Sequence, residues 1–188
     1  MVIHSPASMR RLSPILTAFV GLVLSASAFA QDSQPTPAAI ESLDARAAVE
    51  LANDWKGNGV TSFATPEAVH FVFPDGTEVV VPMPEDVMLV SVAPYVTYTH
   101  PCATHYMSGC QGELVGAPVH VRAIASDGAI VIDEVMPTMA NGFIDLWLPR
   151  GQAFDLHMRL DGATTVGLVT THADSRTCVT TLQFTAAR

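Results

Sequence analysis

The strongest constraint on the fold is a series of short apolar segments, separated by turn signals, that begins at residue 87 and runs to the end of the chain. The pairs Asp127-Gly128 and Asp161-Gly162 are typical turn sequences, and apolar and polar residues alternate within 154–158. This alternation indicates half-buried strands, and about seven short strands are typical of a β-sandwich or barrel. The predicted strands are Val87–Tyr98, Pro118–Ala125, Ala129–Val135, Gly142–Leu148, Phe154–Leu160, Thr164–Thr171 and Cys178–Phe184.

The preceding segment has a different pattern. Apolar residues recur every three or four positions over Pro37–Asp54, which predicts a helix with Thr36 as its N-cap. Farther along, Ala68–Phe73 and Thr77–Val81 flank the turn sequence Pro74-Asp75-Gly76, which predicts a β-hairpin.

Together these patterns predict an α+β fold. Residues 31–84 would form a small helix-plus-hairpin unit, and residues 85–188 a larger all-β, sandwich-like domain, with a boundary at Pro82-Met83-Pro84. A unit of about 50 residues buries little apolar surface alone. We therefore expect residues 31–84 to dock on another surface or to mediate a dimer.

The first thirty residues have the pattern of a secretory signal peptide. Arg10 and Arg11 form a basic start, Ile15–Leu24 is apolar, and Ala28-Phe29-Ala30 is an A-x-A cleavage site. The apolar run falls short of the roughly 20 residues that a membrane span needs. Cleavage after Ala30 would leave 158 residues with a net charge of −11 in the periplasm.

Composition excludes several classes of function. The chain is 49% hydrophobic and only 14% charged, which argues against intrinsic disorder. Its net charge of −9 argues against a nucleic-acid partner, because phosphate binding needs Lys and Arg. Lys56 is the only lysine, so a basic membrane-docking patch is not expected either.

The candidate functional residues are three cysteines and their neighbours. Cys102 and Cys110 lie in one short segment, and Cys178 lies far along the chain. An odd number in an exported protein means that at least one thiol is free, bound to metal or joined to another chain. The first segment also contains His100, His105 and Met107, and His172 precedes Cys178. Thiolates, imidazoles and thioethers suit Cu(I), and thiolate with imidazole also suits Zn(II).

The residues alone leave three functions open. The first is a copper-binding protein whose thiols could also reduce Cu(II), with turnover dependent on a separate reductant. The second is a zinc-binding Cys3His module. The third is an interaction domain without metal, in which a Cys102–Cys110 disulfide fixes the loop and Cys178 is buried as a small hydrophobic residue. Whether the protein is an enzyme is left open, because turnover of Cu(II) would need that separate reductant. Common hydrolase and phosphate-loop motifs are missing from the sequence.

Three sequence motifs resemble the CueP family of periplasmic copper-binding proteins. They are His100-Pro101-Cys102-x-x-His105-x-x-Ser108-x-Cys110-x-Gly112-Glu113, Asp145-Leu146-Trp147-Leu148-Pro149-Arg150 and Thr177-Cys178-Val179-Thr180-Thr181-Leu182. The resemblance implies a homodimeric copper-resistance protein that holds Cu(I), reduces Cu(II) and delivers copper to a periplasmic copper-zinc superoxide dismutase. It also implies that Cys102, His105, Cys110 and Cys178 are the metal ligands.

The remaining candidates are weaker. His100, Met107 and His172 are secondary ligand candidates by position and softness. Met136 and Met139 are more typical of core methionines. For His105, an ordinary histidine pKa of about 6.5 predicts that Cu(II) capture weakens below about pH 6.

Overall fold

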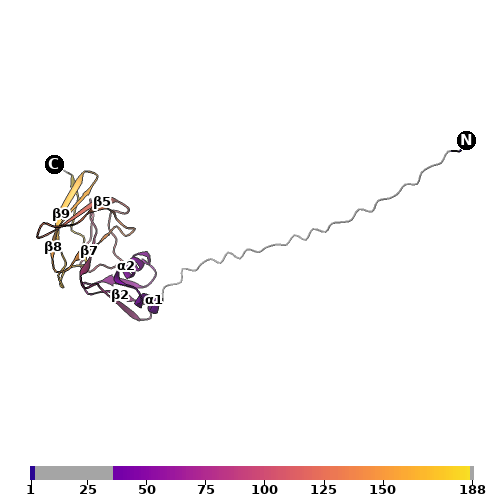
Figure 1. Ribbon diagram of the computed structural model, residues 1–188, viewed down its shortest axis with the longest axis horizontal. Helices are drawn as coiled ribbons and strands as arrows, with labels where there is room; N and C mark the ends of the chain where they lie inside the picture. The colour runs from indigo at the N-terminus through magenta and orange to yellow at the C-terminus, as the bar shows by residue number, and fades with distance from the viewer. Residues whose placement is uncertain (3–35, 187–188) are drawn as a thin grey trace. The chain divides into compact units, whose positions relative to one another are not determined.

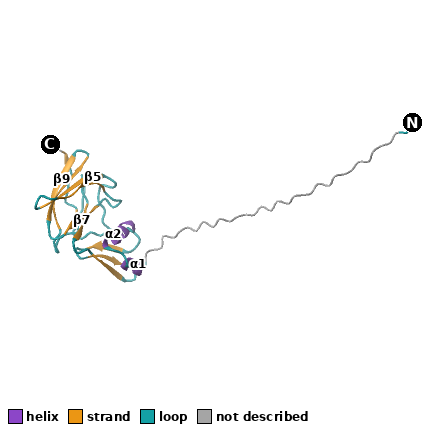
Figure 2. Cartoon of the chain, in the orientation of Figure 1, coloured by secondary structure: helices purple, strands orange, loops and turns teal. Residues whose placement is uncertain are grey.

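The computed structural model describes residues 1–2 and 36–186, and the predicted signal peptide with its cleavage site lies outside these residues (Figure 1). Two short helices come first, and three β-sheets follow (Figure 2). The predicted α+β class is therefore confirmed. No helix in the described part of the chain has the length and hydrophobicity needed to cross a membrane.

The predicted N-terminal helix is two helices. α1 spans Pro37–Glu41 with Thr36 as its N-cap, as predicted, and α2 spans Ala45–Asp54. The single helix over 37–54 is wrong because two side chains interrupt it. The hydroxyl of Ser42 donates to the Ala39 carbonyl at 2.7 Å, and the Asp44 carboxylate accepts from the Ala47 amide at 2.9 Å. Asp44 thus caps a new helix instead of continuing the first.

The first sheet has the antiparallel order β1-β2-β3. β2 (Ala68–Val72) and β3 (Glu78–Pro82) form the predicted hairpin, with Gly76 at φ 87° in its turn. β1 (Thr61–Ala64) was not predicted. Only four residues long, it presents too short an alternation to identify, and its pairing with β2 is a tertiary property.

The second sheet has the order β10-β4-β7. β4 (Val87–Val92) pairs antiparallel with β7 (Ile144–Pro149) and parallel with the short β10 (Cys178–Val179). The predicted strand over 87–98 is too long, since Pro94 has no amide to continue the ladder.

The third sheet is antiparallel, with the order β11-β9-β8-β5-β6. Four of its five strands agree closely with the predicted segments, and β11 lies beyond the last predicted one. They are β5 (Pro118–Ala125), β6 (Ile130–Pro137), β8 (Ala153–Leu160), β9 (Ala163–Thr170) and β11 (Thr185–Ala186). The predicted strand over 178–184 is too long, because only its first two residues form a strand, β10, and β11 begins after its end. Between them the Thr180 hydroxyl donates to the His100 carbonyl at 2.7 Å, so this stretch binds the loop instead of a strand.

Strand β4 is buried on both faces and separates two hydrophobic cores. Met88 and Val90 pack in the sandwich core between the second and third sheets. Leu89 packs in the other core, together with the helices and the first sheet. Figure 1 shows β7 between the five-stranded sheet and α2. The helix-plus-hairpin segment therefore docks on the second sheet, while the predicted domain boundary at residue 84 stays a prediction.

Candidate metal centre

The predicted ligands lie on two segments that the fold brings together. Most are on the loop between β4 and β5, and Cys178 begins β10. The Cys178 amide donates to the Ala103 carbonyl at 3.1 Å, which joins the two segments directly. The parallel pairing of β10 with β4 holds Cys178 beside Ser91. The pairing of β10 with β4, two strands distant in sequence, thus places Cys178 beside the loop.

A disulfide joins Cys102 to Cys178, with a Cα–Cα distance of 5.6 Å and a sequence separation of 76. This corrects the Cys102–Cys110 disulfide considered in the alternative without metal. Cys110 is the free thiol, and Cys178 is fully buried. The spacing of Cys102 and Cys110 could not reveal this pairing, because it depends on the long-range contact between β10 and the loop.

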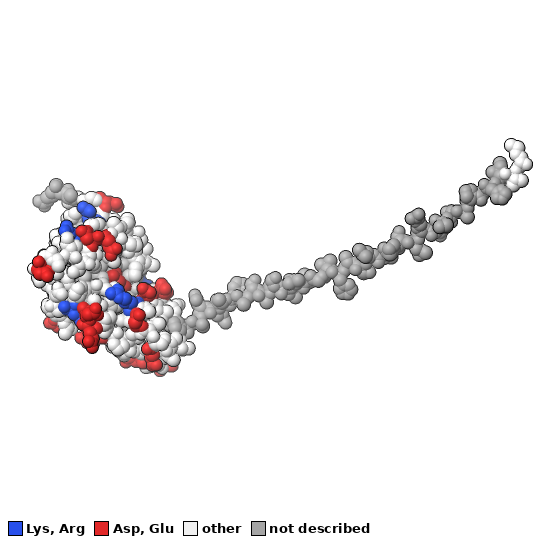
Figure 3. Space-filling model, in the orientation of Figure 1, with Lys and Arg blue, Asp and Glu red and all other residues white. Residues whose placement is uncertain are grey.

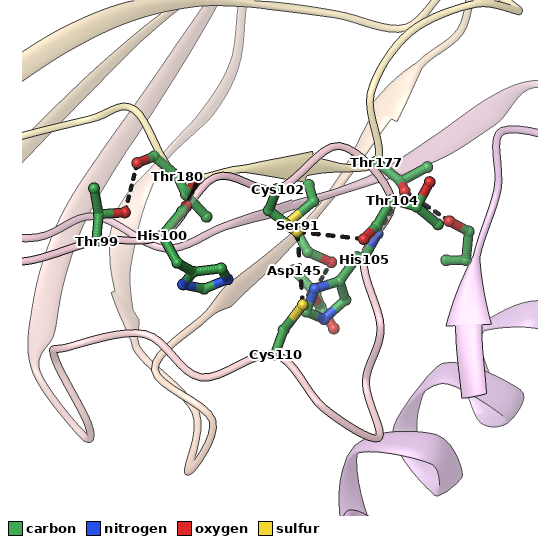
Figure 4. Close-up of a disulfide and its surroundings, with 12 residues drawn as sticks. Ser91, Thr99, His100, Cys102, Thr104, His105, Cys110, Asp145, Thr177 and Thr180 are labelled. Carbon is green, nitrogen blue, oxygen red and sulfur yellow. Dashed lines mark hydrogen bonds between the residues drawn. A yellow bond between two sulfur atoms is a disulfide. The ribbon is translucent and has the colours of Figure 1, made fainter. Parts of the chain in front are cut away.

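The free Cys110 thiol is close to the other donors. Its Sγ lies 3.6 Å from the Cys102 Sγ. Two groups of donor atoms, each within 4.8 Å of one another, are His100–Cys102–Cys110 and His105–Cys110–Cys178. Figure 4 shows the Cys110 sulfur and the His105 ring next to each other on one side of the disulfide. Cys110 belongs to both groups and is the centre of the cluster.

His105 is fully buried, and neither ring nitrogen has a hydrogen-bond partner within the described residues. Its main chain is held on both sides. The amide donates to the Thr177 hydroxyl at 3.0 Å, and the carbonyl accepts from the Ala64 amide at 2.9 Å. The ring packs on Phe143 at a centroid distance of 4.4 Å. A buried imidazole with no partner carries an energetic cost, which a metal ion would offset.

Burial lowers the pKa of His105 to about 3, and the positive charges of Lys56 and His100 contribute in the same direction. The imidazole is therefore neutral, which is the form that binds metals. This corrects the expectation based on a pKa of about 6.5. In the metal-free protein, protons compete for this ring only near pH 3.

Lys56, just after α2, holds the loop that carries Cys110. Its ammonium donates to the Cys110 carbonyl at 2.7 Å and to the Gln111 side-chain carbonyl at 2.6 Å. Burial lowers the pKa of Lys56, and the Cys110 thiol opposes this shift. The N-terminal segment thus contributes a direct contact to the metal centre.

Two glycines permit a close backbone approach behind the same loop. The Gly112 amide donates to the Asn141 carbonyl at 2.7 Å. A Cβ at Gly112 would lie 2.6 Å from the Gly142 carbonyl oxygen, which is too close for any side chain. Gly142 itself has φ 77°. The loop therefore reaches its position only because both residues are glycine.

A buried polar network supports the turn that carries Phe143. Ser91 and Asn53 donate to the Asp145 carboxylate at 2.5 and 3.0 Å. Asn141 donates to the Asn53 side-chain carbonyl at 2.9 Å and accepts from the Phe143 amide at 3.0 Å. Burial raises the pKa of Asp145, against the opposing effect of its two hydrogen bonds. This network joins α2, β4 and β7 behind the aromatic ring that contacts His105.

The weaker candidates divide into two groups. His100 lies in the donor cluster, and Met139 packs with Cys102 and Cys110 in a small apolar cluster. Met107 is buried in the core beside the helices, His172 is exposed, and Met136 packs against the sandwich core. Of these three, His172 belongs to neither group of His and Cys donor atoms in the described chain.

Sequence reasoning missed the supporting residues. Lys56 was noted only as the single lysine, and Phe143 and Asp145 were not considered as parts of the site. For Asp145, two signals were available: its place in one of the three family motifs, and an acidic residue inside an apolar strand segment, which indicates a buried charge with a structural partner.

The fold and the site define a class of protein: a β-rich domain with a buried cluster of sulfur and imidazole donors, suited to a soft metal ion. The family model described as periplasmic copper-binding protein CueP matches residues 43–183. The chain belongs to the CueP family.

A solved structure supports this assignment. The crystal structure of S.CueP superposes on this chain with a TM-score of 0.72 at 29% sequence identity, covering 77% of this chain and 90% of that one. The search of curated proteins found no significant match. The description of the family as periplasmic copper-binding proteins therefore agrees with the cluster of sulfur and imidazole donors in this chain.

Proposed function

We propose that this protein captures copper in the periplasm, where its predicted signal peptide would deliver it. In this proposal Cys102, His105, Cys110 and Cys178 hold the metal as Cu(I) when the Cys102–Cys178 disulfide is reduced and both cysteines are thiolates. The observation that carries the proposal is the position of Cys110. Its thiol shares donor groups with His105 and with both cysteines of the disulfide. Soft sulfur donors favour Cu(I) over harder ions.

The disulfide supports a redox role for the same residues. When Cys102 and Cys178 are reduced, their two thiols can lose two electrons and two protons and form the sulfur–sulfur bond. Those electrons reduce two Cu(II) ions to two Cu(I) ions, so the step balances. The disulfide in the structure corresponds to the oxidised product. Another turnover requires an external dithiol to reopen this bond by thiol–disulfide exchange.

His105 fits a role in the capture of Cu(II), because imidazole suits Cu(II) better than Cu(I). We expect His105→Ala to impair Cu(II) capture and reduction more than the retention of Cu(I). Reduction is measured with a Cu(I)-specific chelator in wild type and variant. Since the ring is neutral above about pH 3, its contribution is expected to stay constant from pH 7 to about pH 5. Equal rates in both proteins would leave His105 with a structural role only.

The central test is the Cu(I) stoichiometry and affinity of the fully reduced protein and of each Cys→Ser variant. Each of the three substitutions is expected to weaken binding sharply. Unchanged affinity in Cys178→Ser would remove the third sulfur from the centre. A Cys3His site could also hold Zn(II). Competition between the two metals decides this alternative, and tight binding of Zn(II) with weak binding of Cu(I) would favour it.

The proposal also names two kinds of protein partner. We include delivery of copper to a periplasmic copper-zinc superoxide dismutase and a homodimer formed through residues 31–84. Copper transfer is tested by activation of a metal-free dismutase with the loaded protein, against free copper buffered at the same activity. A monomer in sedimentation at micromolar concentration would contradict the dimer.

A further inference from the structure

A cavity of about 470 Å³ opens on the outer face of the five-stranded sheet, on the side away from the sandwich core. Its wall comes from β5, β6, β8 and β9. None of the residues that line it belongs to the metal centre. Basic and hydroxyl side chains are concentrated in this wall, and their positions follow from the strand register.

Two rows of side chains cross the cavity. In one row Asp133, Arg122 and His157 are partners on β6, β5 and β8. In the next row Arg159 on β8 is the partner of both His120 on β5 and Thr164 on β9. Residues directly opposite on adjacent strands have Cβ atoms about 5 Å apart. The register therefore gathers two guanidinium groups and two imidazoles in one small area.

The single carboxylate in the wall does not satisfy these groups. Asp133 contacts His120 Nε2 at 3.1 Å, and its other oxygen lies 3.7 Å from Arg122 Nε. This second distance exceeds a hydrogen bond. Arg122 Nε is buried and has no hydrogen-bond partner among the described residues. Among the residues that the structure describes, the side chains of Arg159 and His157 have no partner in an ion pair or hydrogen bond.

This concentration of positive charge is unusual for the molecule. The chain has a net charge of −9 and only nine Lys and Arg residues. Figure 3 shows few Lys and Arg side chains on the face drawn, while Asp and Glu side chains are spread across it. The cavity contains two arginines and one carboxylate, so it has a local excess of positive charge. The strand register also places the hydrogen-bond donors of these side chains close together.

We propose that this cavity binds a small organic anion with two or more carboxylate groups. The planar guanidinium group matches a carboxylate in a two-pronged hydrogen-bonded pair, which favours carboxylates over spherical anions. Ile124 and Val166 in the wall offer apolar contact to the carbon skeleton of such a ligand. The Thr164 hydroxyl supplies a further polar group at the edge.

The experiment uses the metal-free mature protein, because a polycarboxylate also chelates copper. Citrate is titrated by calorimetry and by nuclear magnetic resonance, with acetate and chloride as reference anions. The expected result is saturable binding of citrate, with resonance shifts confined to β5, β6, β8 and β9. Acetate and chloride are expected to bind at least tenfold more weakly.

The variant Arg122→Gln/Arg159→Gln is expected to weaken citrate binding at least tenfold. Arg176→Gln is the control for the single variant Arg159→Gln, because each removes one positive charge from an exposed position. Arg176 lies outside the cavity, and its substitution is expected to leave binding unchanged. Circular dichroism verifies the fold, and Arg159→Gln alone provides a milder variant. Three results would overturn the proposal: no saturable binding, equal weakening by the control, or equal affinity for citrate and chloride.

Discussion

The metal centre and the outer-sheet cavity are built in opposite ways. The candidate metal centre lies on an irregular loop, and its donors are sulfur atoms and imidazoles, of which the buried His105 ring is neutral. The outer-sheet cavity lies on regular strands, and its donors are mostly charged N–H groups. Strand register alone sets the positions of the cavity residues. The loop needs separate contacts from Lys56, the disulfide and the paired glycines to hold its donors. Substitutions of the residues that hold the loop should therefore lower the affinity for copper and leave the outer-sheet cavity unchanged.

The largest effect is expected from Cys110→Ser. Because Cys110 belongs to both groups of donor atoms, the substitution should lower Cu(I) affinity more than about 100-fold, beyond the usual effect of residues that only support ligands. Competition with a chromophoric Cu(I) chelator measures this loss. The control Met107→Leu changes a soft residue of the same loop that packs in the core beside the helices, and it should retain affinity. Equal losses in both variants would show that the loop, and not the thiol, was damaged.

The second-largest effect is expected from Gly112→Ala. The added Cβ would collide with the Gly142 carbonyl, so the loop must move and the fold should lose about 2 kcal/mol. Copper affinity is expected to fall with it, while the cavity keeps its citrate affinity. The control is Gly109→Ala in the same loop, where the Cβ meets no atom within 4 Å. Chemical denaturation gives the free energy of unfolding, and similar values for the two variants would contradict the close approach.

Lys56→Gln tests the contact from the N-terminal segment. Loss of the ammonium leaves the Cys110 carbonyl without its donor, and copper affinity should fall about tenfold, as for other groups that position ligands. Arg46→Gln removes a charge from α2, where the guanidinium lies 4.5 Å from the Trp147 ring centroid. It serves as the control and should leave copper affinity unchanged. The same chelator competition applies, and an unaltered Lys56→Gln protein would remove Lys56 from the site.

The smallest effect concerns stability and pH. Because the folded state raises the pKa of Asp145, this carboxyl favours folding below its ordinary pKa, and that contribution is lost as pH rises through the raised value. Asp145→Asn cannot ionise and lacks this dependence. Unfolding free energies measured from pH 3 to pH 8 should therefore show the wild type losing stability relative to the variant as pH rises. A difference that does not vary with pH would mean that the carboxyl titrates normally.

The sequence predicted elements whose signals are local. Pro118–Ala125 was predicted with its observed bounds, and Pro74-Asp75-Gly76 located the first hairpin, because alternation and turn residues act over a few positions. Thr36 was identified as a helix cap for the same reason. β1 and the break at Ser42 were missed, since they depend on pairing and on side-chain hydrogen bonds that composition alone does not reveal.

The site was predicted in part for a related reason. Cys102, His105 and Cys110 are close in sequence, so their common site follows from the loop. The partner of Cys102 does not follow, because parallel pairing of β10 with β4 brings Cys178 from 76 positions away. The depressed pKa of His105 was equally inaccessible. It depends on burial and on Lys56, neither of which spacing can indicate.

The long sequence separation of Cys102 and Cys178 has a consequence for the stability of the protein in its reduced state. This bond encloses most of the sandwich in one covalent ring, and closing a ring of this length stabilises a fold by about 4 kcal/mol in the chain-entropy account. Breaking it to free the thiols removes that tether before any metal arrives. The reduced, metal-free chain is therefore the state most exposed to unfolding and proteolysis. In the proposed function, copper bound across the same sulfurs would replace the lost crosslink, so the stability of the reduced protein would depend on the metal it binds.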